Sequence, residues 1–172
     1  GKEKIADGPE GASTYLRSFR DTYYGGRAFA NAFAREGYVV VVHDVFLWGS
    51  RKFPLDVMPD RDRTLGPAVA PTIGDGVEGR EIGAYNGSAY LHEHLAEKYC
   101  RILGTTFAAV AAYEDRVALN YLLGRDDVEA GRVASIGLSG GGLRSSLLHA
   151  TSDRLAACAI AGMMNTYEEL LD

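Results

Sequence analysis

The sequence predicts an α/β fold, in which a parallel sheet carries flanking helices. Three observations lead to this prediction: apolar β-branched segments without polar alternation, helical segments between them, and a glycine-rich turn that joins a strand to a helix. A strand that lacks alternation is buried on both faces, as strands are in parallel sheets. The order helix, strand, insertion, helix, strand, helix, strand predicts right-handed crossover connections.

Length and composition fit a single domain over residues 1–172. Of these residues 47% are hydrophobic and 24% charged, and the formal net charge is −5. Because the chain has no basic stripe and no apolar run of about 20 residues, we expect neither nucleic-acid binding nor a membrane partner. Cys100 and Cys158 have neither zinc-site nor redox-motif spacing. We expect a cytoplasmic protein that uses no cofactor or metal.

The first third of the chain predicts one helix and one strand. Residues 1–22 are polar and contain glycine and proline, so we expect no regular element there. Pairs of phenylalanines and of alanines four residues apart predict a helix over 23–36, with Gly37 at the position of a C-terminal cap. The valine-rich run 38–46 predicts a strand buried on both faces.

Residues 47–87 predict a long loop. Four of the five prolines and six glycines fall in this segment, and no apolar period of 2 or 3.6 residues survives. Long loops inside compact domains are often functional. Ser88 can cap a short helix that continues to about residue 103. We therefore predict that residues 54–100 form a loop-rich insertion and a candidate lid.

The last third of the chain alternates helices and strands. A helix is predicted over 106–123 and a strand over 132–136. A glycine-rich turn follows this strand and leads into a helix that carries Leu143 and Leu147. A further strand is predicted over 155–161, which completes the α/β pattern.

The segment Gly137-Leu138-Ser139-Gly140-Gly141 carries the most informative pattern. Gly-x-Ser-x-Gly between a strand and a helix is typical of a nucleophile elbow, a tight turn that exposes a serine hydroxyl above the sheet. Gly137 and Gly141 supply the small residues that such a turn needs two positions before and after Ser139. The Gly140 amide would donate a hydrogen bond to a developing oxyanion. The alternatives are a glycine-rich turn without chemistry and a phosphate-binding turn, but the latter would need a glycine where Ser139 stands.

Three residues near the end of the predicted strand 38–46 are candidate substrate contacts. Trp48 and Arg51 follow its carboxyl end, where α/β proteins bind ligands, and His43 could approach the same pocket. Structural roles are the alternatives: part of a small aromatic core, an ion pair that orders the insertion, and a hydrogen-bonded histidine. Asp44 is predicted to form a turn rather than to act as a catalytic acid.

With these segments the chain resembles the α/β-hydrolase superfamily, and within it the branch of dienelactone hydrolases and acetyl-xylan esterases. The resemblance covers most of the chain except residues 54–100, and the elbow is its most specific part. It implies an α/β-hydrolase-type fold and a serine hydrolase of small acyl esters or lactones, which works through an acyl-enzyme on Ser139. The segments that carry the resemblance are Tyr24-Gly25-Gly26-Arg27, 34–44, Trp48-Gly49-Ser50-Arg51, 113–123, 128–142, Asp153-Arg154-Leu155 and 162–167.

The chain departs from this family in the position of its histidines. In the family the acid and the histidine follow the serine along the chain, whereas no histidine here stands where the base would be. His149 lies ten residues beyond Ser139 on the same predicted helix, about 15 Å along its axis. We expect the acid and the histidine beyond Asp172 and a second oxyanion donor before Gly1, so that these residues are the middle of a longer protein. The four histidines are His43, His92, His94 and His149.

Two other functions stay open at this point. A serine peptidase of the prolyl-oligopeptidase type shares the elbow and its Gly-Gly-Gly extension. A hydrolase-like binding module would keep the turn for structure alone, although an intact Ser139 argues against that. The partner expected from the first interpretation is a small-molecule ester.

Overall fold

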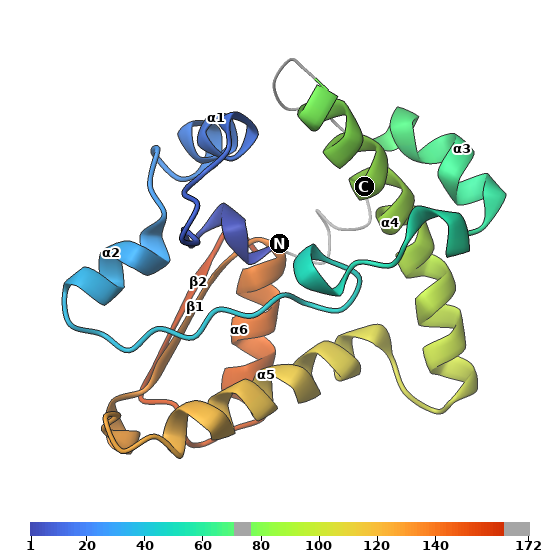
Figure 1. The fold of residues 1–172 in the computed structure, drawn as a ribbon. Helices are drawn as coiled ribbons and strands as arrows, with labels where there is room; N and C mark the ends of the chain where they lie inside the picture. Colours follow the sequence, from blue (N-terminus) through green and yellow to red (C-terminus); the bar gives the residue numbers. More distant parts are fainter. Residues whose placement is uncertain (71–76, 164–172) are drawn as a thin grey trace. The chain divides into compact units, whose positions relative to one another are not determined.

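The computed structural model describes residues 1–70 and 77–163, and Figure 1 shows their elements. The chain divides into two compact units, Gly1–Phe107 (unit 1) and Ala108–Asp172 (unit 2), each of which is described by itself. The described residues are mostly helical and contain one parallel sheet. The predicted α/β class with a parallel sheet is confirmed at this level, and a single domain stays a prediction.

The sheet of unit 2 consists of two parallel strands, β1 (Ala134–Leu138) and β2 (Ala157–Ala161). Helix α6 (Gly140–Ala150) connects them and packs beside both (Figure 1). Helix α5 (Phe107–Leu123) matches the predicted 106–123 closely. The sequence predicted both strands, and the structure starts each of them two residues later. The core is apolar and is made of Leu119, Val133, Leu148 and Leu155.

Unit 1 begins with two helices, α1 (Thr14–Tyr23) and α2 (Phe29–Arg35). Gly37 adopts φ +92° just after α2, so the predicted C-terminal cap is confirmed. The prediction of no regular element over 1–22 is wrong for α1. Ser13 caps α1 by accepting a hydrogen bond of 3.3 Å from the Leu16 amide.

One polar side chain of this segment is buried. Arg20 is only 4% exposed, because its guanidinium donates hydrogen bonds to the backbone carbonyls of Lys4 (3.1 Å) and Glu3 and to the Asp7 carboxylate (2.6 Å). These carbonyls lie in and beside the short 3-10 helix η1 (Lys2–Lys4). One arginine thus joins α1 to the N-terminal segment, an arrangement that hydrophobic periodicity cannot reveal.

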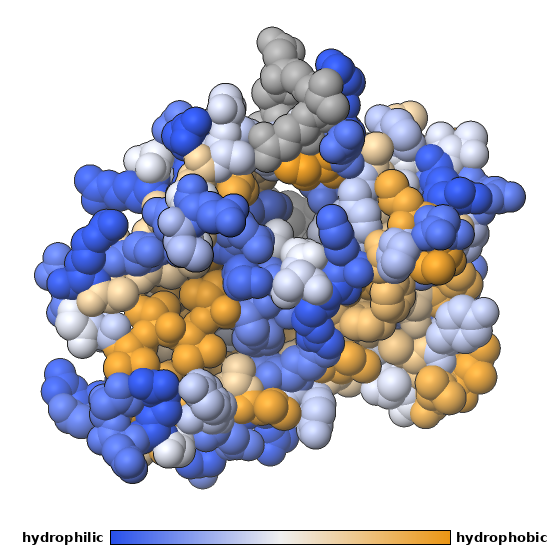
Figure 2. Space-filling model, viewed as in Figure 1, coloured by the Kyte–Doolittle hydropathy of each residue, from blue (hydrophilic) through white to orange (hydrophobic). Residues whose placement is uncertain are grey.

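The predicted strand 38–46 is wrong in the part of the chain that the structure describes. Residues 38–45 have no regular secondary structure, and the one sheet contains only β1 and β2. Tyr38 and Val39 are 63% and 39% exposed, and Figure 2 shows hydrophobic residues at the surface along this segment. A β-branched run becomes a strand only where another strand edge pairs with it, and a single sequence does not report that pairing.

The predicted loop over 47–87 is wrong for most of its length. Two short 3-10 helices, η2 (Gly49–Arg51) and η3 (Leu55–Val57), lead into helices α3 (Asp60–Val69) and α4 (Val77–Ile102). Residues 71–76 lie outside the described residues. That residues 54–100 act as a lid stays a prediction.

Glycines in this segment serve a close approach between α3 and α4. A Cβ on Gly87 would overlap the Gly66 carbonyl, and a Cβ on Gly66 would overlap Ser88. The Ser88 hydroxyl donates a hydrogen bond of 2.9 Å back to the Ala84 carbonyl and stays buried. In the sequence these glycines indicate a loop, whereas in the structure they allow two helix backbones to touch.

The turn between residues 44 and 51 depends on the buried Asp44 carboxylate. It accepts hydrogen bonds from the Ser50 amide (2.9 Å), the Ser50 hydroxyl (2.8 Å), the Lys2 ammonium (2.7 Å) and the Lys2 amide. Burial would raise the pKa of Asp44, but these donors outweigh burial and hold its pKa well below the ordinary value. Asp44 is therefore the turn former that the sequence predicted.

We predict that Gly87→Ala destabilises unit 1 by about 1–3 kcal/mol, because its methyl group would overlap the Gly66 backbone. Gly83→Ala is the matched control in α4. Among the described residues a Cβ there meets nothing within 4 Å, so this variant should gain up to about 1 kcal/mol of helix propensity. Urea unfolding followed by the fluorescence of Trp48, the single tryptophan, measures both. Equal urea midpoints for the two variants would contradict the close contact between Gly66 and Gly87.

We predict that Asp44→Asn destabilises unit 1 at pH 7 by about 1.5–3 kcal/mol, since charge-assisted hydrogen bonds are lost. A carboxylate whose pKa is lowered by folding stabilises the protein above its unfolded-state pKa of about 3.9. That contribution is lost as the pH falls through the folded-state pKa. The free-energy difference between wild type and variant should therefore shrink below about pH 4. A difference that stays constant down to pH 2.5 would contradict the assigned charge.

Candidate active site

Ser139 lies at the junction between the end of β1 and the start of α6. Its backbone has φ +54° and ψ −120°, a conformation that is strained for any residue except glycine. Leu47 is the other non-glycine residue with positive φ in the described ranges. Such a conformation costs about 1–3 kcal/mol and persists only where the surroundings enforce it. The predicted tight strand-to-helix turn is present, and Ser139 is solvent-exposed.

Backbone hydrogen bonds hold Ser139 from two sides. Its amide donates to the Ala161 carbonyl at the end of β2 (2.8 Å), and its carbonyl accepts from the Leu143 amide in α6 (3.0 Å). The first bond ties the turn to the neighbouring strand, and the second starts the helix. The serine side chain therefore projects from a junction that both strands and the helix fix.

Two glycines make the turn sterically possible. Gly137 is buried, and a Cβ at that position would overlap the Gly141 carbonyl in the first turn of α6. A Cβ on Gly142 would lie 3.1 Å from the Ala161 carbonyl oxygen and 3.1 Å from the Met163 Cβ. The predicted need for a small residue at Gly137 is confirmed, and Gly142 carries a second constraint that the sequence analysis did not assign.

The predicted steric need at Gly141 is wrong within the described residues. A Cβ added there meets nothing within 4 Å. The carbonyl of Gly141, rather than its α-carbon, makes the close approach to β1. The backbone of Gly141 therefore packs tightly against β1, while the space into which a side chain at this position would extend is empty among the described residues.

The N-terminus of α6 places amide donors beside Ser139. The first amides of a helix have no acceptor within the helix, so those of Gly140, Gly141 and Gly142 point out of its positive end. Gly140 directly follows the serine and is exposed. An oxyanion that develops next to the Ser139 hydroxyl can accept a hydrogen bond from the Gly140 amide.

A buried ion pair fixes the direction of α6. Arg144, five residues after Ser139, donates two hydrogen bonds to the Asp115 carboxylate on α5, one of them of 3.0 Å from its Nε. The Asp115 side chain is 9% exposed. Because both oxygens of the carboxylate are engaged, the pair sets the orientation of α6 as well as its distance from α5. No sequence motif pointed to this contact.

The candidate substrate contacts lie in unit 1 and have partners there. The Trp48 indole donates a hydrogen bond of 2.6 Å to Glu93. Burial raises the pKa of the Glu93 carboxyl above its ordinary value, although this hydrogen bond acts to lower it. Arg51 donates to the Asp44 carbonyl at 3.4 Å, and His43 Nδ1 lies 3.3 Å from the same oxygen. These contacts agree with the structural alternatives. A role in substrate binding stays a prediction for all three residues.

The histidines divide between the units. His149 is exposed in the last turn of α6, at the negative end of the helix dipole, and lies about 15 Å along the axis from Ser139. His92, in unit 1, has its Nδ1 3.5 Å from the Asp62 carboxylate. The sequence does not indicate this pair, because the loop predicted over 47–87 gives no reason to bring the two residues together.

Comparison with known proteins gives no relatives: no family model, curated protein or solved structure matches this chain. The resemblance described above therefore stays an inference from the residues, and residues 164–167 of it lie outside the described residues. In the described ranges no helix combines the length and apolar character that a membrane span requires, and no group of three metal-ligating side chains lies together.

We predict opposite outcomes for alanine at the two ends of the turn. Gly137→Ala should destabilise unit 2 by about 1–3 kcal/mol, because its methyl group overlaps the Gly141 carbonyl. Gly141→Ala, the matched control, should be neutral or slightly stabilising. Hydrogen exchange at the amides of β1 and α6, read by mass spectrometry, reports this unit directly. Loss of protection in both variants would contradict the assigned packing.

Proposed function

We propose that the protein is a serine hydrolase of the α/β-hydrolase type that cleaves carboxylic esters through an acyl-enzyme on Ser139. One observation carries the proposal: an exposed serine holds a strained positive-φ conformation between a parallel strand and a helix. Strain of this kind concentrates at functional sites, because a structural turn could relieve it with glycine. The family-level resemblance of the sequence supports the same proposal.

The geometry supplies two of the groups that acyl transfer needs. The Ser139 hydroxyl attacks the ester carbonyl carbon, and its proton passes to a histidine. The carbonyl oxygen becomes an oxyanion that accepts a hydrogen bond from the Gly140 amide. When the intermediate collapses, the alcohol leaves with the proton from the histidine, and Ser139 holds the acyl group. Water then attacks the acyl-enzyme by the same steps and releases the carboxylic acid.

The histidine and its acid partner are the groups that the described residues of unit 2 do not supply. His149 is the only histidine in the sequence of this unit, and its position at the far end of α6 keeps it from Ser139. We propose that the base and acid come from another part of the protein, as the family order of serine, acid and histidine predicts. The substrate class that fits is an acetyl or other small acyl ester, or a lactone.

We predict that Ser139→Ala, in the full-length protein, lowers kcat for p-nitrophenyl acetate by at least about 10³-fold, as loss of a triad serine does. Ser146→Ala is the matched control, since Ser146 is on the same helix and its hydroxyl only donates to the Leu143 carbonyl (2.7 Å). It should keep kcat within about twofold.

Three results would contradict this proposal. A fluorophosphonate that labels another serine would move the nucleophile. Turnover of a dipeptidyl amide with none of the ester would favour a peptidase. No turnover of either substrate would leave the turn as part of a binding module.

A further inference from the structure

We propose that a hollow between α3 and α4 binds a small organic carboxylate with an apolar body. The site lies wholly within unit 1 and does not depend on the proposed esterase. The hollow measures about 220 Å³, and the side chains of Pro59, Leu91 and Leu95 supply its apolar surface. Arg61, His94 and Lys98 line the same hollow.

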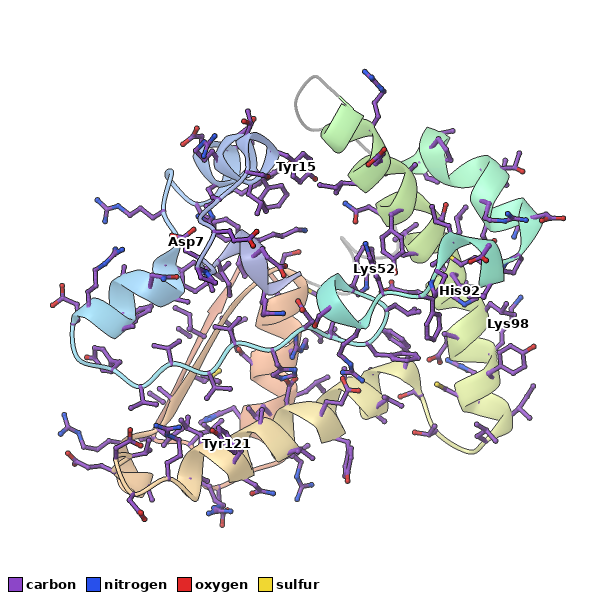
Figure 3. All side chains as sticks on the ribbon, in the orientation of Figure 1. Asp7, Tyr15, Lys52, His92, Lys98 and Tyr121 are labelled. Carbon is purple, nitrogen blue, oxygen red and sulfur yellow. The ribbon has the colours of Figure 1, made fainter. Side chains whose placement is uncertain are left out.

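The two helices meet so that charged residues far apart in sequence share this hollow. Gly66 touches Gly87, and Asp62 lies beside His92, so α3 and α4 run antiparallel. In this register the residues just before α3 approach the part of α4 that contains Lys98, and Pro59 and Lys98 line the same hollow. Figure 3 marks His92 and Lys98 on α4.

Arg61 and Lys98 lack counter-charges. Neither forms an ion pair with any residue in the described ranges, and both are exposed. Two cations that line one hollow without an ion-pair partner repel each other, and an anion between them removes that repulsion. The excess of positive charge is local, because the whole chain has a net charge of −5.

Three acids near the hollow that do not line it are engaged elsewhere. Asp60 pairs with Arg63, and the Glu97 carboxylate pairs with Arg101 (2.7 Å) and accepts from the Phe107 amide (2.7 Å). Glu93 accepts from the Trp48 indole. None of these three carboxylates neutralises the cations of the hollow.

Asp62 also lines the hollow, but its carboxylate is buried and faces His92. Its side chain is 6% exposed, and its carboxylate lies 3.5 Å from His92 Nδ1, a buried nitrogen with no hydrogen-bond partner. Asp62 also stands in the first turn of α3, where the helix dipole favours a negative charge. The buried carboxylate therefore limits how deep an anionic head can enter, and the ligand head stays near Arg61 and Lys98.

These features select a class of ligand. A guanidinium and an ammonium recognise a carboxylate, and the apolar surface takes an aliphatic chain or a ring. The hollow is smaller than most ligand pockets, which span about 300–1,000 Å³, so the ligand is small. Inorganic phosphate would meet the cations but leave the leucine surface uncovered, so a monocarboxylate with a short chain fits better.

The test is a titration of the full-length protein with sodium hexanoate, followed by the methyl NMR signals of Leu91 and Leu95. We expect saturable shifts with a dissociation constant on the order of 1 mM, weakened by salt. Hexanol has the same chain without the charge, and phosphate has the charge without the chain. Each should bind at least about tenfold more weakly than hexanoate.

Variants assign the binding to the two cations. Lys98→Gln and Arg61→Gln should each weaken hexanoate by about fivefold or more, and the double variant should abolish saturation. Arg63→Gln and Arg101→Gln are matched controls on the same helices, because both arginines are already paired with acids outside the hollow. They should stay within about twofold of wild type.

Several outcomes would overturn the proposal. Equal binding of hexanol would show an apolar groove without anion recognition, and equal binding of phosphate would show a cationic patch alone. Unchanged affinity in the Lys98 and Arg61 variants would place the site elsewhere. If a variant loses the methyl spectrum of the folded protein, the salt dependence of wild-type binding decides: affinity that is the same at 20 and about 500 mM salt contradicts a carboxylate site.

Discussion

The backbone turn at Ser139 is the constraint on which the rest of unit 2 depends. β1 must pass directly into α6, and the chain achieves this by placing a serine at positive φ and a glycine against the carbonyl of the first helical turn. The amide of Ser139 is then in reach of Ala161, which aligns β2 beside β1. The Asp115–Arg144 pair holds α6 in the direction that this turn requires. Because a serine rather than a glycine occupies the strained position, this turn is a candidate active site and not only a structural turn.

Close backbone approach is the common physical theme of both units. Gly137 lies against Gly141 in unit 2, and Gly66 lies against Gly87 in unit 1. A methyl group on Gly137 or Gly87 would overlap the carbonyl of its partner glycine, so these two glycines are required by contact and not by their own dihedral angles, since neither has positive φ. Two segments packed this closely cannot easily shift relative to each other, and a functional site requires such a rigid scaffold.

The sequence predicted those features that depend on local pattern. The helix α5, the two strands of the sheet and the turn at Ser139 follow from periodicity and from residues adjacent in the chain. It failed where a partner distant in sequence decides the outcome. The valines of 38–42 have strand propensity but no strand edge among the described residues, and Arg20 is buried only because carbonyls of η1 receive it. The glycines of α3 and α4 indicated a loop in the sequence, although Gly66 and Gly87 are needed because each lies against the backbone of the other helix. Of the candidate site, the exposed turn at Ser139 and the neighbouring Gly140 amide could be predicted from the sequence, whereas the Asp62–His92 pair and the hollow beside it could not.

The most direct test of this account compares glycine with alanine at Ser139. At an ordinary helical position alanine is more stable than glycine by about 1 kcal/mol, and Ser146 in α6 provides that control. If the backbone at Ser139 is strained, the order reverses, and Ser139→Gly should be more stable than Ser139→Ala by about 1 kcal/mol or more. The free energy of unfolding is read from hydrogen exchange of β1 and α6 amides under increasing urea. An alanine variant that is as stable as the glycine variant, or more so, would contradict a strained turn at Ser139.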